Sequence, residues 1–588
     1  MLKNNKIYIF FTAVFLLFLC LITYGDILTH GFMIDERTYL KPTATIFASY
    51  QNLGDFFKKP MDHHYNPFNH LLNVALFLLF QNPFPLYLIN LILFYINCFL
   101  LFILVYFLSE SFITALFTSV IFCIHPMTAD ILQHITLNIL LVQTIFMELS
   151  LIALYLYSKQ NKNIFYYIFS FLMAILALFC HEIILLFPLY VWALLFCLTD
   201  LKFRRIIKLT IPFVFLNIFL IALWLHFVNV SVHLENVKTW HPRFMGTLSA
   251  NFSHLFFWYL SNLVVPRNIV FICNRPPLVD FIWFWNLLFF GFLTGCGFLI
   301  FFYFKKSLES FALVLFLTGF VFAFFASQVL FESKGEWLFE PNWVYFPSIG
   351  FYLFIVLIFL RLRKYLNKKL FIVFTSVLFI FYFLLTLNLN ILSRTELSYC
   401  ENWLRKSPDN YTAGFIAASY YCHHKGIVIP SDIIPDMLYL TDIAVKDDFR
   451  EAPDLIERIL SSNISSTQRK ELSYQLAAYH CKNGHKDKCD EAIYSIVGSQ
   501  KDSYAYVQLG YAFYKCGANK AAINLLKQCI ALYPTYKEPY ILIGVILANS
   551  GHYEESLNSL KQALAIDPRD VRIISKIEEA KNLINKSY

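Results

Sequence analysis

Positive charge in this sequence is concentrated in five short segments that separate long apolar stretches. These segments are the N-terminal MLKNNK, SKQNKN at 158–163, DLKFRR at 200–205, FKKS at 304–307 and RLRKYLNKK at 361–369. Loops on the cytoplasmic side of a membrane collect Lys and Arg, so each segment marks the side on which it lies. The sequence therefore predicts a chain that crosses a membrane many times in one fixed orientation.

Composition supports this prediction, because 58% of the residues are hydrophobic and only 15% are charged. A helix needs about 20 apolar residues to cross the hydrocarbon core of a bilayer. We expect eleven spans, and they cover 7–24, 84–107, 111–124, 138–157, 164–180, 183–199, 206–228, 279–303, 310–330, 345–360 and 370–388. The first has no small-residue cleavage site and is expected to stay as an anchor.

Two further apolar segments, 67–80 and 252–265, are too short to cross comfortably. We expect them to lie on the outer face or at the interface, because counting them as spans would place the SKQNKN loop outside. An odd number of spans puts the C-terminal region on the outer side. The predicted outer segments are 25–83, 125–137, 229–278, 331–344 and the tail after about 389.

The expected fold class is all-α, with a polytopic membrane helical bundle over 1–389 and a soluble helical region over 390–588. In the tail, residues of the same kind recur at a spacing of 34. The pairs are Gly510 and Gly544, Gly517 and Gly551, Pro534 and Pro568, Tyr506 and Tyr540, and Leu526 and Leu560. This period resembles the tetratricopeptide repeat, a helix–turn–helix unit. The clearest repeats are 503–536 and 537–570, followed by a capping helix, and such an α-solenoid binds a protein partner.

Cysteine usage leaves two interpretations open for the tail. Six of the thirteen cysteines lie there, and an outer compartment permits disulfides, with Cys481 and Cys489 as candidates across one helical hairpin. The alternative is that all six are buried as small hydrophobic side chains. The net charge of +8 does not indicate nucleic acid, because the five basic loops supply much of the excess.

Polar residues gather in three predicted outer loops. The long loop 25–83 carries the adjacent acids Asp35 and Glu36, HPMTADILQHITLN at 125–138 carries several polar side chains, and a very short loop carries His181 and Glu182. Solvated or interfacial side chains are one interpretation, and a functional site beside the bilayer is the other. The spacing of His125, Asp130 and His134 fits no standard closed zinc site.

Several motifs occur in an order that resembles a known family. They are GFMIDERTYL at 31–40, NPFPLYLIN at 82–90, HPMTAD at 125–130, the His181–Glu182 pair, and EPNWVYFPSIGF at 340–351. Together they resemble the membrane-embedded C-type glycosyltransferase superfamily (GT-C). Within that superfamily, the chain is most similar to the transmembrane and tetratricopeptide-repeat O-mannosyltransferase-like proteins. The resemblance extends over nearly the whole chain, the repeats included.

The resemblance implies a glycosyltransferase that moves a mannose-like sugar from a polyprenyl-phosphate donor to a hydroxyl on a polypeptide or glycan acceptor. The implied catalytic residues are Asp35 as the base, Glu36 and Asp130. The implied substrate-binding residues are His125, Asn138, His181, Glu182, Asn342, Trp343 and Tyr345. No cofactor is required by this assignment, and a divalent cation, Mg²⁺ or Mn²⁺, stays open as an aid to the leaving phosphate.

The chain departs from the family where similar sequences often carry a cation. Arg is common in the family at the positions of Asn66 and Asn138, and Arg or His is common at the position of Asn342. His181 stands where the family has Lys. The remaining candidates for holding phosphate are Arg37, Lys41, His63, His64, His125, His181, Arg267 and Lys334. A non-catalytic membrane scaffold whose repeats recruit a protein partner is therefore the alternative. A transporter is disfavoured, because we see no clear charge at mid-membrane and no inverted repeat.

The alternation of basic loops predicts the topology. We expect an inner bacterial membrane with the repeats in the periplasm, or the ER membrane with luminal repeats in a eukaryote. A reporter that is active only outside the cytoplasm, fused after residue 588, should be active, and the same reporter fused in the 158–163 loop should be silent. A C-terminal fusion that works only in the cytoplasm would contradict the whole orientation.

Overall fold

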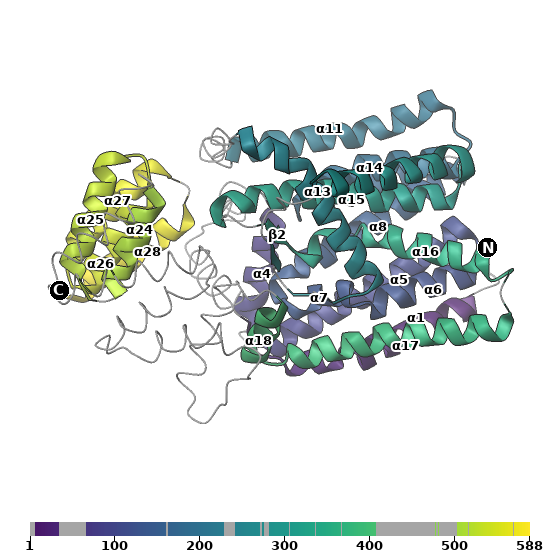
Figure 1. The fold of residues 1–588 in the computed structure, drawn as a ribbon, viewed down its shortest axis with the longest axis horizontal. Coiled ribbons are helices and arrows are strands. Elements are labelled where there is room, and N and C mark those ends of the chain that lie inside the picture. The colour runs from purple at the N-terminus through teal and green to yellow at the C-terminus, as the bar shows by residue number, and fades with distance from the viewer. Residues whose placement is uncertain are drawn as a thin grey trace. The chain divides into compact units, whose positions relative to one another are not determined.

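The structure is a computed structural model, and Figure 1 shows its fold. It describes residues 6–33, 66–80, 82–159, 163–227, 242–267, 269–270, 273–275, 282–304, 306–334, 337–365, 367–406, 477, 480, 503–515, 517–568 and 570–587. These residues belong to two compact units, a membrane unit that ends at Ser407 and a repeat unit that follows it. Both are built from helices, with one two-stranded sheet in the membrane unit.

The membrane unit is a bundle of apolar helices. Its long helices are α1 (Lys6–Tyr24), α4 (Pro67–Phe80), α5 (Pro83–Ser109), α6 (Phe112–Ile124), α8 (Asn138–Lys159), α9 (Ile164–Leu178), α10 (Phe187–Leu198), α11 (Phe203–Phe227), α13 (Pro242–Val264), α14 (Ile282–Phe298), α15 (Leu308–Lys334), α16 (Ser348–Leu362) and α17 (Lys368–Leu392). The shorter elements are η2 (Gly25–Thr29), α7 (Pro126–Gln133), η4 (Ile135–Leu137), η5 (Glu182–Leu186), η6 (Leu299–Phe304), η7 (Pro341–Val344) and α18 (Glu396–Lys406). Strands β1 (Cys273–Arg275) and β2 (Trp337–Phe339) pair antiparallel.

Each predicted span coincides with a helix of this bundle, and the two segments expected at the interface form α4 and α13. Five helical segments in the described residues are long and apolar enough to cross a membrane, and α6 with α7 counts as a sixth if the bent pair is one span. Further apolar helical segments of the membrane unit, among them Ile164–Leu178, Leu308–Ala323 and Ser348–Leu362, have 10–17 residues. The all-α membrane fold is thus confirmed, whereas the number of eleven crossings stays a prediction.

Local sequence explains where helices begin and end. Asn82 caps α5 by accepting from the backbone N–H of Phe84 at 2.9 Å, and Pro83 occupies the first turn, where its missing N–H costs nothing. The helix stops at Glu110, whose φ of 53° is left-handed. Ser111 then caps α6 through the Thr114 N–H. The basic and polar segments between apolar runs therefore turn the chain back on itself.

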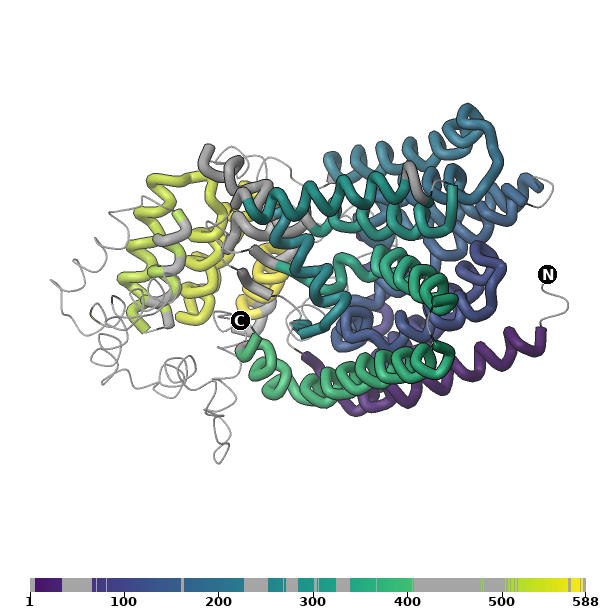
Figure 2. Tube along the Cα trace, turned by 45° about the vertical axis from the view of Figure 1, so that its right-hand side comes forward, coloured from purple at the N-terminus to yellow at the C-terminus, as the bar shows by residue number. Residues whose placement is uncertain are grey.

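Close packing depends on small residues at helix crossings. The backbone of α16 lies so near α15 that a Cβ on Gly350 would come within 2.4 Å of the Ala312 carbonyl oxygen. Between α8 and α9, the Ser150 hydroxyl donates to the Ser170 carbonyl oxygen at 2.7 Å. Helices α1 and α17 lie side by side at one edge of the unit, as Figures 1 and 2 both show. Polar pairs at such crossings stabilise helix contacts in hydrocarbon.

The structure corrects two predictions about segment boundaries. Residues 125–137, predicted as an outer loop, form the short helix α7, which is bent by 51° from α6, and the turn η4. The predicted boundary at 389 was also too early, because α18 belongs to the membrane unit. Its side chains Tyr399 and Trp403 are buried there, so hydrophobic burial extends beyond the last long apolar segment.

The repeat unit confirms the period of 34 residues. Helices α24 (Ser503–Lys515), α25 (Asn519–Leu532), α26 (Glu538–Asn549) and α27 (Tyr553–Ile566) form two helical hairpins, and α28 (Val571–Ser587) packs on α27 as the expected capping helix. A Cβ on Gly510 would come within 2.8 Å of Leu526, and one on Gly544 within 2.7 Å of Leu560. Equivalent glycines therefore let the helices of each hairpin approach closely.

Two turns of the repeats require glycine for another reason. Gly517 has a φ of 75° and Gly551 a φ of 83°, both in the left-handed region that L-residues with a side chain rarely adopt. Of the tail cysteines, Cys400 and Cys529 are described, and both are buried, although Cys400 lies in the membrane unit. The candidate disulfide pair Cys481 and Cys489 lies outside the described residues.

A partly buried cation, Lys537, links the two ends of the second repeat. Lys537 Nζ lies 2.7 Å from Asp567 Oδ2 and 2.6 Å from Asp570 Oδ2. Burial lowers the pKa of Lys537, but hydrogen bonds from its ammonium to the two carboxylates outweigh burial, and the net pKa is raised. Because the pKa is raised on folding, the two ion pairs of Lys537 contribute to stability. Their contribution is complete below the ordinary Lys pKa of 10.5 and is lost as pH rises through the higher pKa of the folded state.

Replacing Lys537 with Met should loosen the second repeat. The two carboxylates would lose their common partner and repel each other, at a cost of about 1–3 kcal/mol. Hydrogen exchange in α26–α28 of the full-length protein should accelerate accordingly. The matched control is Lys561→Met on the exposed face of α27, which should leave exchange unchanged. Equal exchange in both variants would show that the ion pairs do not stabilise the repeat.

Candidate functional site

The candidate site is organised around α7, a short helix whose residues are all buried, the polar Thr128, Asp130 and Gln133 included. At its N-terminus, His125 Nδ1 accepts from the Met127 backbone N–H at 3.1 Å. The Nε2 atom of the same ring lies 3.0 Å from the Leu263 carbonyl oxygen at the end of α13. Because Nδ1 accepts, Nε2 carries the proton and donates. His125 therefore caps α7 and ties it to α13.

The other end of α7 is held by α5, α17 and α18. The Gln133 amide donates to Asn390 Oδ1 at 2.7 Å, and Asn390 donates to the Thr23 carbonyl oxygen at 2.6 Å. The Tyr87 hydroxyl donates to the Gln133 carbonyl oxygen at 3.3 Å. His134 Nε2 lies 3.1 Å from the Tyr399 hydroxyl. Both ends of α7 are thus positioned by specific hydrogen bonds rather than by apolar contact alone.

Asp130 lies between these two ends and differs from its neighbours. Its side chain is 1% exposed, and neither carboxylate oxygen has a hydrogen-bond partner among the described residues. Lys406, at the end of α18, interacts with it electrostatically. The Lys406 ammonium also donates to the Ile269 carbonyl oxygen at 3.1 Å. Burying a carboxyl group without a hydrogen-bond partner is costly, so Asp130 is a candidate for a functional role.

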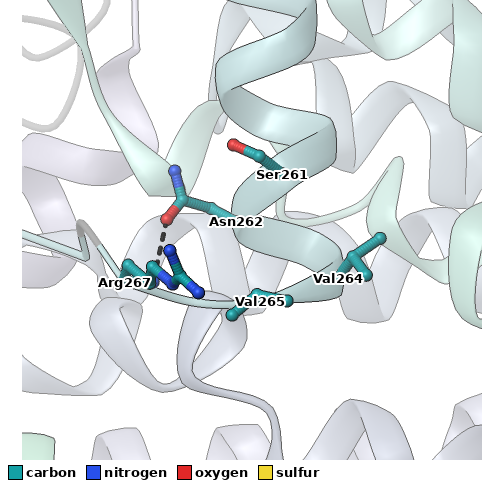
Figure 3. A pocket seen from close by; sticks show the side chains of 5 residues that line it. All are labelled: Ser261, Asn262, Val264, Val265 and Arg267. Carbon is teal, nitrogen blue, oxygen red and sulfur yellow. Dashed lines mark hydrogen bonds between the residues drawn. The ribbon is translucent and has the colours of Figure 1, made fainter.

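The segment after α13 brings a second cation to this region. Arg267 and four neighbours line a pocket of ≈ 490 Å³, shown in Figure 3; the others are Ser261, Asn262, Val264 and Val265. Asn262 Oδ1 accepts from the Arg267 backbone N–H at 3.1 Å and holds the turn. The guanidinium makes no ion pair within the part of the chain that the structure describes. Leu263 therefore contacts His125, Ile269 contacts Lys406, and Arg267 lies between these two residues in the sequence.

A second group of predicted residues lies at the starts of α8 and η5. The Asn138 amide donates to Asn73 Oδ1 at 2.8 Å, joining α8 to α4. Gln143 donates to the His181 carbonyl oxygen at 2.5 Å. His181 Nδ1 lies 3.6 Å from Glu182 Oε2, and both side chains are mostly buried. These contacts fix Asn138, His181 and Glu182 within the bundle. Their role in substrate binding stays a prediction.

Residues of the EPNWVYFPSIGF motif form η7, which packs against α7. The Asn342 amide donates to Glu340 Oε2 at 3.1 Å, and the Tyr259 hydroxyl donates to the Glu340 carbonyl oxygen at 2.7 Å. Trp343 is buried. Tyr345 is buried against Phe122, with ring centroids 5.2 Å apart. The structure thus brings Asn342 and Trp343 beside α7, whereas Tyr345 points into the apolar core.

The predicted catalytic acids of the first outer loop, Asp35 and Glu36, lie outside the described residues. So do four candidate cations, which are Arg37, Lys41, His63 and His64. Among the residues that are described, the His, Asp and Glu side chains of the site form no cluster with metal-binding spacing, and the group that does is a set of three cysteines. A divalent cation at the site stays a prediction.

Sequence analysis missed two residues. Lys406 was assigned to the soluble tail, although the amphipathic stretch 396–406 gave a signal for a helix that packs on the bundle. Glu148 lies near the middle of α8, fully buried, and neither of its carboxylate oxygens has a hydrogen-bond partner among the described residues. A lone acid inside an apolar run is visible in the sequence, so our statement that no charge lies at mid-membrane was wrong.

Comparisons with known proteins give one family match and one structural similarity. Residues 515–577 match the tetratricopeptide repeat family, which confirms the predicted repeats. No curated protein matches the chain. The archaeal oligosaccharyltransferase AglB from Archaeoglobus fulgidus, solved with an inhibitory peptide and a dolichol-phosphate, is similar with a TM-score of 0.36 and 12% identity. The match covers 74% of this chain and 60% of AglB, and a similarity this weak gives no information on function.

Removing the cap at His125 should loosen α7. His125→Ala deletes the bonds to Met127 and Leu263, and the loss of a helix cap costs about 1–2 kcal/mol. His125→Asn keeps a capping oxygen, but the shorter side chain cannot reach α13. Amide hydrogen exchange in α7 should therefore be fastest in His125→Ala, slower in His125→Asn and slowest in the parent. The control is His552→Ala, because His552 occupies the same position before α27 and makes no cap hydrogen bond. Identical exchange in all variants would contradict the cap.

Proposed function

We propose that the membrane unit is a glycosyltransferase that moves a sugar from a polyprenyl-phosphate donor to a hydroxyl of a polypeptide or glycan on the outer face. The observation that carries the proposal is Asp130, a buried carboxylate without a hydrogen-bond partner in the described residues, on a helix held at both ends. The family resemblance that assigns a catalytic role to Asp130 assigns one to Asp35 and Glu36 of the first outer loop as well. The inner bacterial membrane with periplasmic repeats is the proposed location.

The reaction assigns a task to each charged group. The acceptor hydroxyl gives its proton to Asp35 while its oxygen forms the new bond to the anomeric carbon. The bond from that carbon to the lipid phosphate breaks, and the phosphate leaves with the bonding electrons. Asp130 accepts hydrogen bonds from the donor or acceptor and supports the charge that develops on the sugar. Glu36 assists at the first loop.

The leaving phosphate needs positive charge, and Lys406 joins Arg267, which was already a candidate from the sequence. Arg267 lines a pocket at the end of α13, and Lys406 interacts with Asp130. Arg presents a fork of N–H donors that matches phosphate oxygens, whereas Lys acts as a point charge. We assign Arg267 and Lys406 to the phosphate, with Mg²⁺ or Mn²⁺ held by the acids as the alternative source of charge.

Replacing the acids tests the proposal in a transfer assay with polyprenyl-phosphate sugar. Asp35→Asn should lower the rate about 100-fold to 10,000-fold, because an amide cannot take the proton at neutral pH. Asp130→Asn should also abolish most transfer while membrane insertion is kept. The matched control is Glu148→Gln in α8, another buried carboxyl without a partner among the described residues. Its transfer rate should change little.

The outcomes separate catalysis from structure. Full activity in Asp35→Asn would remove it as the base and transfer that role to Glu36 or Asp130. Loss of activity in Glu148→Gln equal to that in Asp130→Asn would mean that any buried carboxyl is needed for folding. No transfer by the parent protein with any polyprenyl-phosphate sugar would favour a non-catalytic scaffold, the alternative that the repeat match supports.

The repeats are proposed to bind the polypeptide or glycan acceptor and to take no part in bond breaking. Ending the chain after residue 407 keeps α18 and Lys406 in place, so the membrane unit should still bind donor and hydrolyse it slowly with water. Transfer to the natural acceptor should fall steeply. Unchanged transfer would rule out an acceptor role, and lost donor binding would show that the repeats belong to the catalytic unit.

A further inference from the structure

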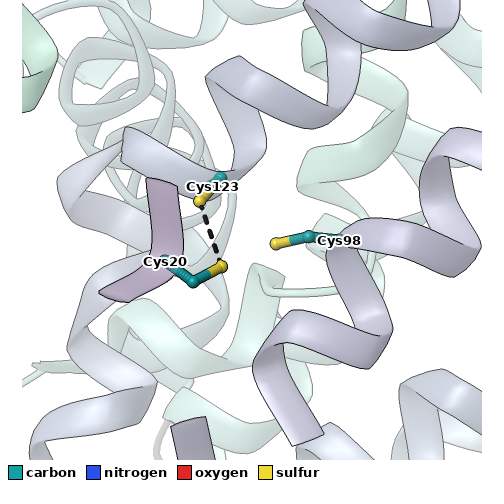
Figure 4. A group of neighbouring side chains, drawn as sticks. All are labelled: Cys20, Cys98 and Cys123. Atoms are coloured by element: carbon teal, nitrogen blue, oxygen red, sulfur yellow. Dashed lines mark hydrogen bonds between the residues drawn. The ribbon is translucent and has the colours of Figure 1, made fainter. Parts of the chain in front are cut away.

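Three cysteines from three different helices meet inside the membrane unit. Cys20 lies on α1, Cys98 on α5 and Cys123 on α6, and all three Sγ atoms lie within 4.8 Å of one another. The sulfurs of Cys20 and Cys123 are 3.5 Å apart. Figure 4 shows the three side chains pointing toward a common centre. These residues are far apart in the sequence, so the fold, not a local motif, brings them together.

The cluster is fully enclosed, because each of the three side chains is 0% exposed. The Tyr24 hydroxyl donates to the Cys123 carbonyl oxygen at 2.5 Å and holds α1 against α6 beside the thiols. The phenol of Tyr345 interacts electrostatically with all three cysteines and with Glu148. Its hydroxyl is buried and has no hydrogen-bond partner in the described residues. Polar groups therefore converge here beside the rings of Phe94 and Phe122, which pack on Tyr24 and Tyr345.

A buried cysteine alone is an ordinary small hydrophobic side chain. Three sulfurs at these distances also match the requirements of a soft metal ion. Three ligands in a plane at a metal–sulfur distance of about 2.3 Å lie roughly 4 Å from one another, within the limit observed here. Sulfur ligands select Cu(I), Zn(II) and iron–sulfur clusters over hard cations such as Mg²⁺.

Charge and ligand number favour Cu(I) among these. Zinc sites of the closed type take four ligands, and the group of metal-ligating side chains described here contains three. Burying a charged complex in an apolar interior is costly. Cu(I) bound by one thiolate and two thiols is neutral, and its formation releases one proton. A neutral Zn(II) complex would need two thiolates, and a closed zinc site would also need a fourth ligand.

We propose that Cys20, Cys98 and Cys123 form a binding site for one Cu(I) ion inside the membrane unit. The ion joins α1, which has a lipid-facing side, to the interior helices α5 and α6. Phe18, Leu21 and Ile22 on α1 are exposed, so the cluster lies one helix below the surface of the bundle. Displacement of α1 provides the path by which the metal enters.

The test uses the full-length protein, purified in detergent without oxygen and titrated with the Cu(I)–bicinchoninate complex. The parent should take up one Cu(I) per chain, show a sulfur-only shell in X-ray absorption, and unfold at a higher temperature with copper than without it. Cys98→Ala should bind at least about 100-fold more weakly. The matched control is Cys197→Ala, which removes a buried cysteine of α10 and should bind as the parent does.

Several results would overturn the proposal. They are less than stoichiometric uptake by the parent, nitrogen or oxygen ligands in the copper shell, or uptake that Cys98→Ala retains. Tighter binding of Zn(II) than of Cu(I) would overturn the choice of metal. The parent's own stoichiometry and ligand shell decide the question even if Cys98→Ala fails to fold. None of these measurements depends on sugar transfer, so the result stands apart from the proposed reaction.

Discussion

The candidate site depends on α7, a short buried helix with three polar residues inside an apolar bundle. In hydrocarbon or in a protein core, polar groups need partners, and the two ends of α7 receive theirs from α5, α13, α17 and α18. His125 uses one ring nitrogen on its own helix and the other on α13. Gln133 is joined through Asn390 to α1. These bonds leave α7 one orientation, and that orientation fixes where Asp130 lies.

Asp130 is the residue of α7 on which the proposed function rests. Its neighbours Thr128 and Gln133 have satisfied side-chain donors, and its own two oxygens have no partner among the described residues. A carboxylate held this way is prepared for a ligand, because no internal hydrogen bond must first be broken. Lys406 and Arg267 lie on segments bonded to the same framework, Lys406 through the Ile269 carbonyl oxygen and Arg267 through Asn262.

Sequence was sufficient for features that depend on local pattern. Apolar runs between basic loops predicted the helices of the bundle, and the recurrence of Gly510 at Gly544 predicted the repeats, because both signals lie within a few tens of residues. The polar segment after His125 was misjudged, since polarity alone does not distinguish a solvated loop from a buried helix with distant partners. Lys406 was missed for a similar reason, because its neighbour Ile269 is 137 residues away.

The interior polar groups illustrate the same limit. Glu148 was visible as one acid in an apolar run, yet its surroundings depend on how α8 packs against α5, α9 and α10. The cysteines at 20, 98 and 123 carry no spacing that a sequence motif would recognise. In each case, the residue type is present in the sequence and the constellation is a product of tertiary structure. In this chain, the candidate functional groups are brought together by contacts between residues that are far apart in the sequence.

Those contacts also explain the absence of Arg at positions where similar sequences often carry it. Asn138 donates to Asn73, and Asn342 donates to Glu340, so both amides are used within the bundle. Asn66 is buried at the start of α4. An Arg at any of these buried positions would require a permanent counter-ion. Lys406 on α18 interacts with Asp130, and Arg267 after α13 lines a pocket. The missing arginines are therefore compatible with the proposed active site, in which other segments would supply the positive charge.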